Sequence, residues 1–164
     1  MAIRKITEYP NPILRVKTKD GIDMERAKRI VRDLTDTMRA FPGCIGLAAP
    51  QIGVSERIAV VDVSDKEPGK GLLVLINPKI VEAKGEKVIR EGCLSIQSLT
   101  ANVKRSVSVT AEWLTLKGTV ERHSADGIEA ICIQHEIDHL NGTLFIDRLL
   151  CAQTDIFRRK KFLH

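Results

Sequence analysis

Apolar residues recur at helical spacing in two segments of the chain, and between these segments they mostly alternate with polar residues. The first helical segment follows Asp23, a suitable N-cap residue, and stops at Pro42-Gly43. This pattern predicts an amphipathic helix over 23–40 that packs one face on the core. The apolar positions of that face are Ala27, Ile30, Val31, Leu34 and Met38.

The second segment lies between Asp126 and Gly142 and is apolar on two sides, so we expect a helix inside the core. Asp126 and Glu129 have the spacing of a capping box, and Asn141-Gly142 is typical of a helix C-terminus. One stripe holds Ile128, Ile131, Cys132, His135 and His139, and the other holds Ala130, Ile133, Ile137 and Leu140.

The alternating segments predict β-strands over 57–63, 72–77, 79–83, 87–90, 106–116 and 119–123. Gly85 and Lys117-Gly118 mark short turns, so we expect 79–83 to pair with 87–90 and 106–116 with 119–123. The fold class is therefore α+β, with small antiparallel sheets around a buried helix and the 23–40 helix outside.

The composition fits one globular domain over residues 1–164. The formal net charge of +5 favours anionic surfaces such as RNA, without by itself indicating a nucleic-acid function. The charged N-terminus and the absence of a run of ~20 apolar residues predict a cytoplasmic protein without a membrane segment. The cysteines are too few for a disulfide scaffold, so we expect reduced thiols at Cys44, Cys93, Cys132 and Cys151.

The last ten residues, 155–164, place a basic cluster between apolar side chains. This pattern is typical of a short basic amphipathic helix, and equally of a frayed charged tail. The cluster consists of Arg158, Arg159, Lys160 and Lys161.

His135 and His139 are four residues apart, which puts both imidazoles on one helix face, within reach of one metal ion. Glu136 lies between them and is suited to take a proton from a water that the metal activates. The pattern H-E-x-x-H thus indicates hydrolysis. It also fits two ordinary histidines that hydrogen bonds satisfy, and a third ligand would decide between these interpretations.

Two other segments have chemical potential. The stretch 44–53 is small and apolar apart from Gln51, and it fits either a loop close to a ligand or a tight connection into a strand. In the segment 91–95 (EGCLS), Gly92 allows a bulge that aims the Cys93 thiol out of the sheet.

Together the three segments resemble peptide deformylase, which removes the formyl group from the N-terminal formylmethionine of newly synthesised polypeptides and releases formate. The family pattern is G-h-G-h-A-A-x-Q, E-G-C-h-S and Q-H-E-h-D-H-h in this order, where h is apolar. The matching segments here are 44–51, 91–95 and 134–140, and 11–15 (NPILR) is similar to the family's N-terminal arm. Cys44 replaces the first glycine, and Gln97 and Thr100 stand where many members have proline and arginine.

The resemblance implies that Cys93, His135 and His139 bind one divalent metal ion, with water in the fourth position, and that Glu136 transfers protons. It implies Fe²⁺ as the native ion, with Zn²⁺, Ni²⁺ or Co²⁺ able to substitute. The donor set alone suits both zinc and iron.

The resemblance also implies that the Gln51 side chain and the Leu94 backbone N–H hold the oxyanion, while Glu91 supports the site. The substrate peptide would lie as an added strand and place its methionine side chain in an apolar pocket. The residues implied in substrate binding are Ile45, Gly46, Gly92, Leu94, Ile128, Ile131 and Cys132.

The implied partners are formylated nascent chains and, through the basic cluster, transient contact with the ribosome, but no DNA and no membrane. The location would be the cytoplasm, or an organellar matrix in a eukaryote. A zincin-like metallopeptidase is the alternative enzyme, although only His164 follows His139 as a candidate third ligand. A non-catalytic metal- or RNA-binding module is the alternative outside enzymes.

Overall fold

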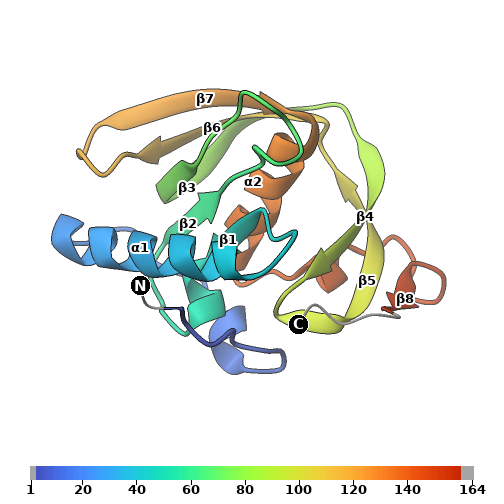
Figure 1. Ribbon diagram of the computed structural model, residues 1–164. Coiled ribbons are helices and arrows are strands. Elements are labelled where there is room, and N and C mark those ends of the chain that lie inside the picture. Colours follow the sequence, from blue (N-terminus) through green and yellow to red (C-terminus); the bar gives the residue numbers. More distant parts are fainter. Residues whose placement is uncertain (1–2, 160–164) are drawn as a thin grey trace.

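The computed structural model describes residues 3–159, which form two antiparallel sheets with a helix between them (Figure 1). The five-stranded sheet has the order β1-β2-β3-β6-β7, and the three-stranded sheet the order β4-β5-β8. The predicted α+β class is confirmed.

The first sheet comprises β1 (Gly46–Ala48), β2 (Ile58–Val61), β3 (Leu73–Lys84), β6 (Ser108–Leu114) and β7 (Val120–Asp126). The second comprises β4 (Lys87–Cys93), β5 (Ile96–Arg105) and β8 (Ile156–Arg158). The helices are α1 (Met24–Ala40) and α2 (Gly127–Leu140), with 3-10 turns η1 (Pro12–Arg15), η2 (Ala49–Ile52) and η3 (Phe145–Arg148).

Strand β2 separates the two helices because its side chains alternate between them. Ile58 and Val60 pack in the cluster that contains the apolar face of α1. Ala59 and Val61 pack in the cluster that contains the inner residues of α2. All four side chains are fully buried, as expected for a strand covered on both faces. Helix α1 therefore lies outside the sheet, as predicted, and α2 inside (Figure 1).

Helix α2 has the predicted C-terminus, with Asn141 as C-cap. The predicted capping box is wrong, because the Asp126 side chain accepts no hydrogen bond at this N-terminus. Glu67 instead accepts a hydrogen bond from the N–H of Ile128 at 2.9 Å. Glu129, the other expected member of the box, is buried and pairs with Lys70 at 2.9 Å. A tertiary contact thus replaces the local cap.

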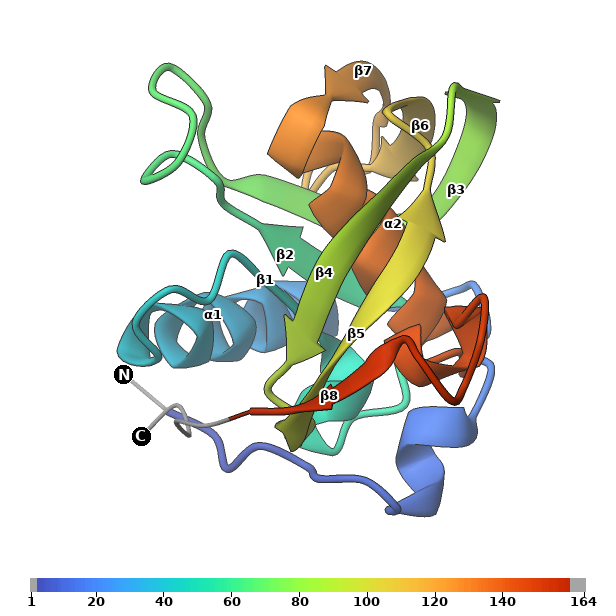
Figure 2. The same cartoon turned by 90° about the vertical axis from the view of Figure 1, so that its right-hand side faces the viewer.

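One of the two predicted hairpins is confirmed. Strands β6 and β7 pair with each other around the turn at Gly118, as expected. The hairpin of 79–83 with 87–90 is wrong, because β3 runs on to Lys84 and pairs with β6, whereas β4 pairs with β5. Gly85, at φ +66°, lies where the chain crosses from one sheet to the other. Figure 2 shows β4 and β5 in front of α2, away from the β3 sheet.

The C-terminal part of the described chain is a strand. Both alternatives for 155–164, a helix and a frayed tail, are wrong for Ile156–Arg158, which pairs as β8 with β5. Backbone pairing with the otherwise open edge of β5 outweighs the helical spacing of the apolar residues. Residues 160–164 lie outside the described part. Neither helix within 3–159 has the length and apolarity needed to cross a membrane.

Candidate metal centre and active site

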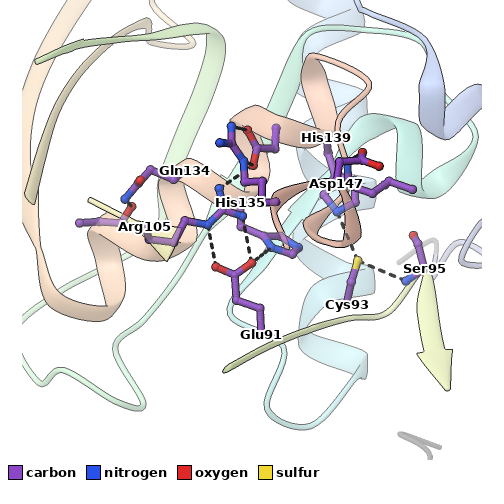
Figure 3. A network of polar contacts seen from close by, with 12 residues as sticks. Glu91, Cys93, Ser95, Arg105, Gln134, His135, His139 and Asp147 are labelled. Carbon is purple, nitrogen blue, oxygen red and sulfur yellow. Dashed lines mark hydrogen bonds and ion pairs between the residues drawn. The ribbon is translucent and has the colours of Figure 1, made fainter. Parts of the chain in front are cut away.

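Three side chains from the two predicted segments converge on one point between α2 and β4. Cys93, His135 and His139 each offer a ligand atom, and these atoms lie within 4.8 Å of one another. The Cys93 Sγ lies 3.2 Å from Nε2 of His139 (Figure 3). The register of β4 with β5 shifts between Gly92 and Cys93, so the predicted bulge is confirmed. The helix supplies the two histidines at the i, i+4 spacing, and the bulge supplies the thiol.

A buried ionic network holds His135 in place (Figure 3). Glu91 accepts a hydrogen bond from Nδ1 of His135 at 2.9 Å. Arg105 donates to both carboxylate oxygens of Glu91, at 2.7 and 2.9 Å, and also to Asp138 of α2. Burial raises the pKa of Glu91, but the hydrogen bonds and charges of Arg105 and His135 outweigh it and lower this pKa to about 2. Glu91 is thus an ionised anchor.

The cysteines near the cleft differ in ionisation. Burial raises the pKa of Cys93, but His139 and His135 outweigh this effect and lower it well below the ordinary thiol value. Burial and the nearby Glu136 raise the pKa of Cys44 to about 12, and they raise that of Cys132 as well. Cys93 therefore has the thiolate that a metal ligand needs, whereas the other two remain thiols. All four cysteines are free, as predicted.

Glu136 lies beside the three candidate ligands and is only 3% exposed. Its Oε2 has no hydrogen-bond partner among residues 3–159. Burial raises the pKa of this carboxyl group to about 7, against the opposing effects of His135 and His139. Such a group can accept and release a proton near neutral pH.

Gln51 projects its amide nitrogen toward the same point. The Ala48 N–H donates to Oε1 of Gln51 at 2.9 Å, which fixes the orientation of the amide. Nε2 then points at Cys93 Sγ, 3.3 Å away. The expected loop at 44–53 therefore contains strand β1 and turn η2, and it delivers a polar donor.

The site opens into a cleft of ≈ 530 Å³. Strands β1 and β4 each form one edge of their sheet within residues 3–159, and segments of both line the cleft. All candidate substrate-binding residues line it as well, namely Ile45, Gly46, Gly92, Leu94, Ile128, Ile131 and Cys132.

Two arginines at this site, Arg105 and Arg159, were not predicted as site residues. Arg105 follows Ala101 and Val103 on the buried side of β5, so strand alternation is the signal that identifies it as an inward-facing charge. Arg159 reaches the cleft from beyond β8. Its place depends on the pairing of β8 with β5, for which the local sequence carries no signal.

Comparison with known proteins agrees with this geometry. The family model of polypeptide deformylase matches residues 3–154. The chain belongs to the polypeptide deformylase family. It is 42% identical over 164 residues to a peptide deformylase of Xylella fastidiosa, covering 98% of this chain and 95% of the relative. It is 45% identical over 161 residues to that of Syntrophobacter fumaroxidans, covering 98% and 94%.

Solved structures give the same result. A peptide deformylase from Legionella pneumophila superposes with a TM-score of 0.84 at 41% identity, over 90% of this chain and 86% of that one. The deformylase of Thermotoga maritima gives a TM-score of 0.84 at 34% identity, over 92% and 100%. The chain is therefore a metal-dependent enzyme that removes the N-formyl group from nascent polypeptides, and the zincin-like alternative is not supported.

Proposed function

We propose that Cys93, His135 and His139 are the ligands of one divalent metal ion and that residues 1–164 act as a single catalytic domain. The observation that carries this proposal is the convergence of the three ligand atoms within 4.8 Å. The donor set fits, because one thiolate and two imidazoles leave a fourth position open, as in catalytic sites. The ion would supply a Lewis acid and lower the pKa of a water in that position.

Glu136 is the general base and then the general acid. Its buried Oε2, which has no partner within residues 3–159, and its pKa of about 7 support this role. The carboxylate takes a proton from the attacking water and delivers it to the amine of methionine as the amide bond breaks. Formate and a free amino terminus result.

Gln51 and Leu94 stabilise the oxyanion that forms as the formyl carbon becomes tetrahedral. The fixed amide of Gln51, which points at the metal-ligand cluster, supports its part. Leu94 lines the cleft, whereas Leu47 of β1 does not. Leu94 therefore restricts the space beside the formyl carbon, and an acetyl methyl group is excluded.

The peptide binds as an extended strand between the edges of β1 and β4. Edge strands offer unpaired backbone groups, and Gly46 and Gly92 allow a close approach. The methionine side chain occupies the apolar part of the cleft. The residues proposed for that pocket are Ile128, Ile131 and Cys132.

The native ion is Fe²⁺, as the family resemblance implies, and Zn²⁺, Ni²⁺ or Co²⁺ can replace it. Thiolate and imidazole ligands accept all four ions. A ferrous site has a liability, because oxidation by air reaches the ligating thiolate of Cys93. The iron form is therefore fast but loses activity in air, whereas the zinc form is slower and stable.

The enzyme acts in the cytoplasm during translation, and the basic cluster 158–161 contacts the ribosome. The net charge of +5 supports attraction to RNA phosphates. Replacing Arg158, Lys160 and Lys161 by Gln should lower co-sedimentation with ribosomes, and the difference from the wild type should shrink at high salt, which screens phosphate contacts. Unchanged co-sedimentation would contradict the contact.

The proposed function is tested with matched peptides. The protein, purified without oxygen, is assayed on N-formylmethionyl-alanine amide and on its N-acetyl counterpart. We expect formate from the first peptide. Acetate release from the second should be at least about 100-fold slower, because the methyl group would displace the carbonyl oxygen from its donors, and loss of one such donor costs several kcal/mol. Equal rates would contradict the proposed oxyanion site.

A further inference from the structure

The cleft wall carries more positive charge than the chemistry at the metal requires. Three cationic side chains line it, Lys87, Arg90 and Arg159. Of the two carboxylates in the lining, Glu91 is already paired with Arg105 and His135. Glu136 is buried beside the candidate ligands. The charged side chains that remain in the lining are therefore cationic.

Arg159 lies directly over Gly92, one residue before the candidate ligand Cys93. A Cβ atom built on Gly92 would overlap Nη2 of Arg159 and would lie 3.1 Å from its Cζ. The Thr100 Cγ2 borders the same point at 3.3 Å. The absence of a side chain at Gly92 thus gives the guanidinium its place. The backbone N–H of Arg159 donates to the Ser98 carbonyl at 2.9 Å and anchors this residue beyond β8.

The guanidinium of Arg159 has a nitrogen that is left open for a ligand within the described part of the chain. Its Nη1 is buried and has no hydrogen-bond partner among residues 3–159. Arg90 is different, because its guanidinium lies 3.5 Å from the centroid of the Phe157 ring. A buried cationic donor without an acceptor is costly, since it has lost its hydration. An acceptor that enters the cleft would remove this cost.

We propose that Arg159 is a specificity residue that binds a carboxylate of the substrate peptide beyond formylmethionine. This proposal rests on the proposed function, in which the formyl carbon lies beside Cys93 and the peptide extends along β4. Strand residues rise by about 3.3 Å each, so Gly92, one residue before Cys93, lies alongside the formylmethionine. The guanidinium over Gly92 is therefore within side-chain reach of the second or third residue of the peptide. The planar guanidinium matches a carboxylate in two-point geometry, better than a lysine would.

The carboxylate can come from an acidic side chain or from the C-terminus of a very short peptide. Three pairs of formylated substrates separate these sources. The first pair differs at position two, which is glutamate or glutamine, and the second pair differs in the same way at position three. Both pairs end in an amide. The third is formylmethionyl-alanine with a free carboxylate or an amide.

The wild-type protein should prefer the acidic member of at least one side-chain pair by about 10-fold in kcat/KM, as a charge-assisted hydrogen bond predicts. In Arg159→Gln this ratio should fall to near one, and in Arg159→Glu it should invert, with the glutamine peptides favoured. Arg159→Lys should keep part of the preference. Arg158→Gln is the matched control, because Arg158 is exposed on β8 and is not among the residues lining the cleft.

A binding measurement accompanies the kinetics. Calorimetric titration of the same peptides into Glu136→Gln, with and without Arg159→Gln, should reproduce the charge preference in Kd. The preference should shrink as salt rises. Melting temperatures of all variants establish that they are folded.

The proposal would be overturned if the ratio of kcat/KM between the carboxylate and the amide member of each pair were the same in the wild type and in Arg159→Gln. An equal rise in kcat/KM for every peptide in Arg159→Gln would also overturn it, because Arg159 would then merely obstruct the cleft. If the preference were confined to the free C-terminus, Arg159 would act only on very short peptides. That result would overturn the recognition of acidic side chains. Absence of formate from every peptide would contradict the proposed function, and the Kd values would still decide the role of Arg159.

Discussion

The carboxylate of Glu91 accepts a hydrogen bond from Nδ1 of His135 at 2.9 Å, and so leaves Nε2 of this imidazole for a metal ion. A partner of this kind orients the ring and raises its basicity. We predict that Glu91→Gln lowers metal affinity about 10- to 100-fold. Competition with a chromogenic chelator measures the affinity. Glu86→Gln is the control, since Glu86 is exposed and pairs with Lys104; equal affinities in the two variants would refute the role of Glu91.

Arg105 links this network to stability. Removing one partner of a buried ion pair costs about 3 kcal/mol, and Arg105→Gln would leave the buried Glu91 and Asp138 without this charge. Arg122→Gln should cost at most about 1 kcal/mol, because Arg122 and Glu112 pair on the surface at 3.4 Å. Chemical denaturation at neutral pH compares the two variants. Similar losses of stability in the two variants would contradict the role of Arg105 in the buried network.

The pH dependence of unfolding provides an independent test. The pKa of Glu91 is lowered from 4.5 to about 2 in the folded protein. A carboxylate with a lowered pKa stabilises the fold above its unfolded value, and this contribution is lost as the pH falls from 4.5 toward about 2. Arg105→Gln removes a charge that lowers this pKa, so the variant should lose less stability than the wild type between pH 4.5 and about 2, and the two curves should converge at low pH. Parallel curves of melting temperature against pH would be inconsistent with this linkage.

Glu136→Gln should lower turnover at least about 100-fold and leave the metal bound. The amide has nearly the same shape as the carboxylate but cannot accept the proton, and Glu136 is not among the three proposed ligands. Metal analysis and formate release on the same sample measure the two properties. Loss of the metal, or near-normal turnover, would show that Glu136 is not the base.

Gly46 allows the close approach of β1 to α2. A Cβ atom on Gly46 would lie 2.5 Å from Oε1 of Glu136 and 2.6 Å from Sγ of Cys132. We predict that Gly46→Ala displaces the carboxylate, lowers kcat more than about 10-fold and destabilises the fold by about 1–3 kcal/mol. Gly71→Ala is the control, because a Cβ there meets nothing within 4 Å. Equal kcat in both variants would rule out this contact as functional.

The parts of the site that were predicted from sequence depend on local spacing. His135 and His139 share a face because a helix brings residues four apart together, and the Gly92-Cys93 bulge follows from a glycine within a strand. The parts that were missed depend on tertiary contacts. Glu67 caps α2 from a distant loop, and Arg159 reaches the cleft through a strand pairing. The crossing at Gly85 was mistaken for a hairpin because the partners of alternating strands are not specified locally.

The most direct test of the metal centre is a stoichiometric titration of the metal-free protein. Fe²⁺ is added without oxygen to the wild type and to Cys93→Ala, and formate release from a formylmethionyl peptide is followed. In the wild type, activity should rise linearly and stop at one ion per chain, and Cys93→Ala should bind weakly and remain inactive. Activity in the metal-free protein, or a Cys93→Ala variant that matches the wild type, would contradict the account.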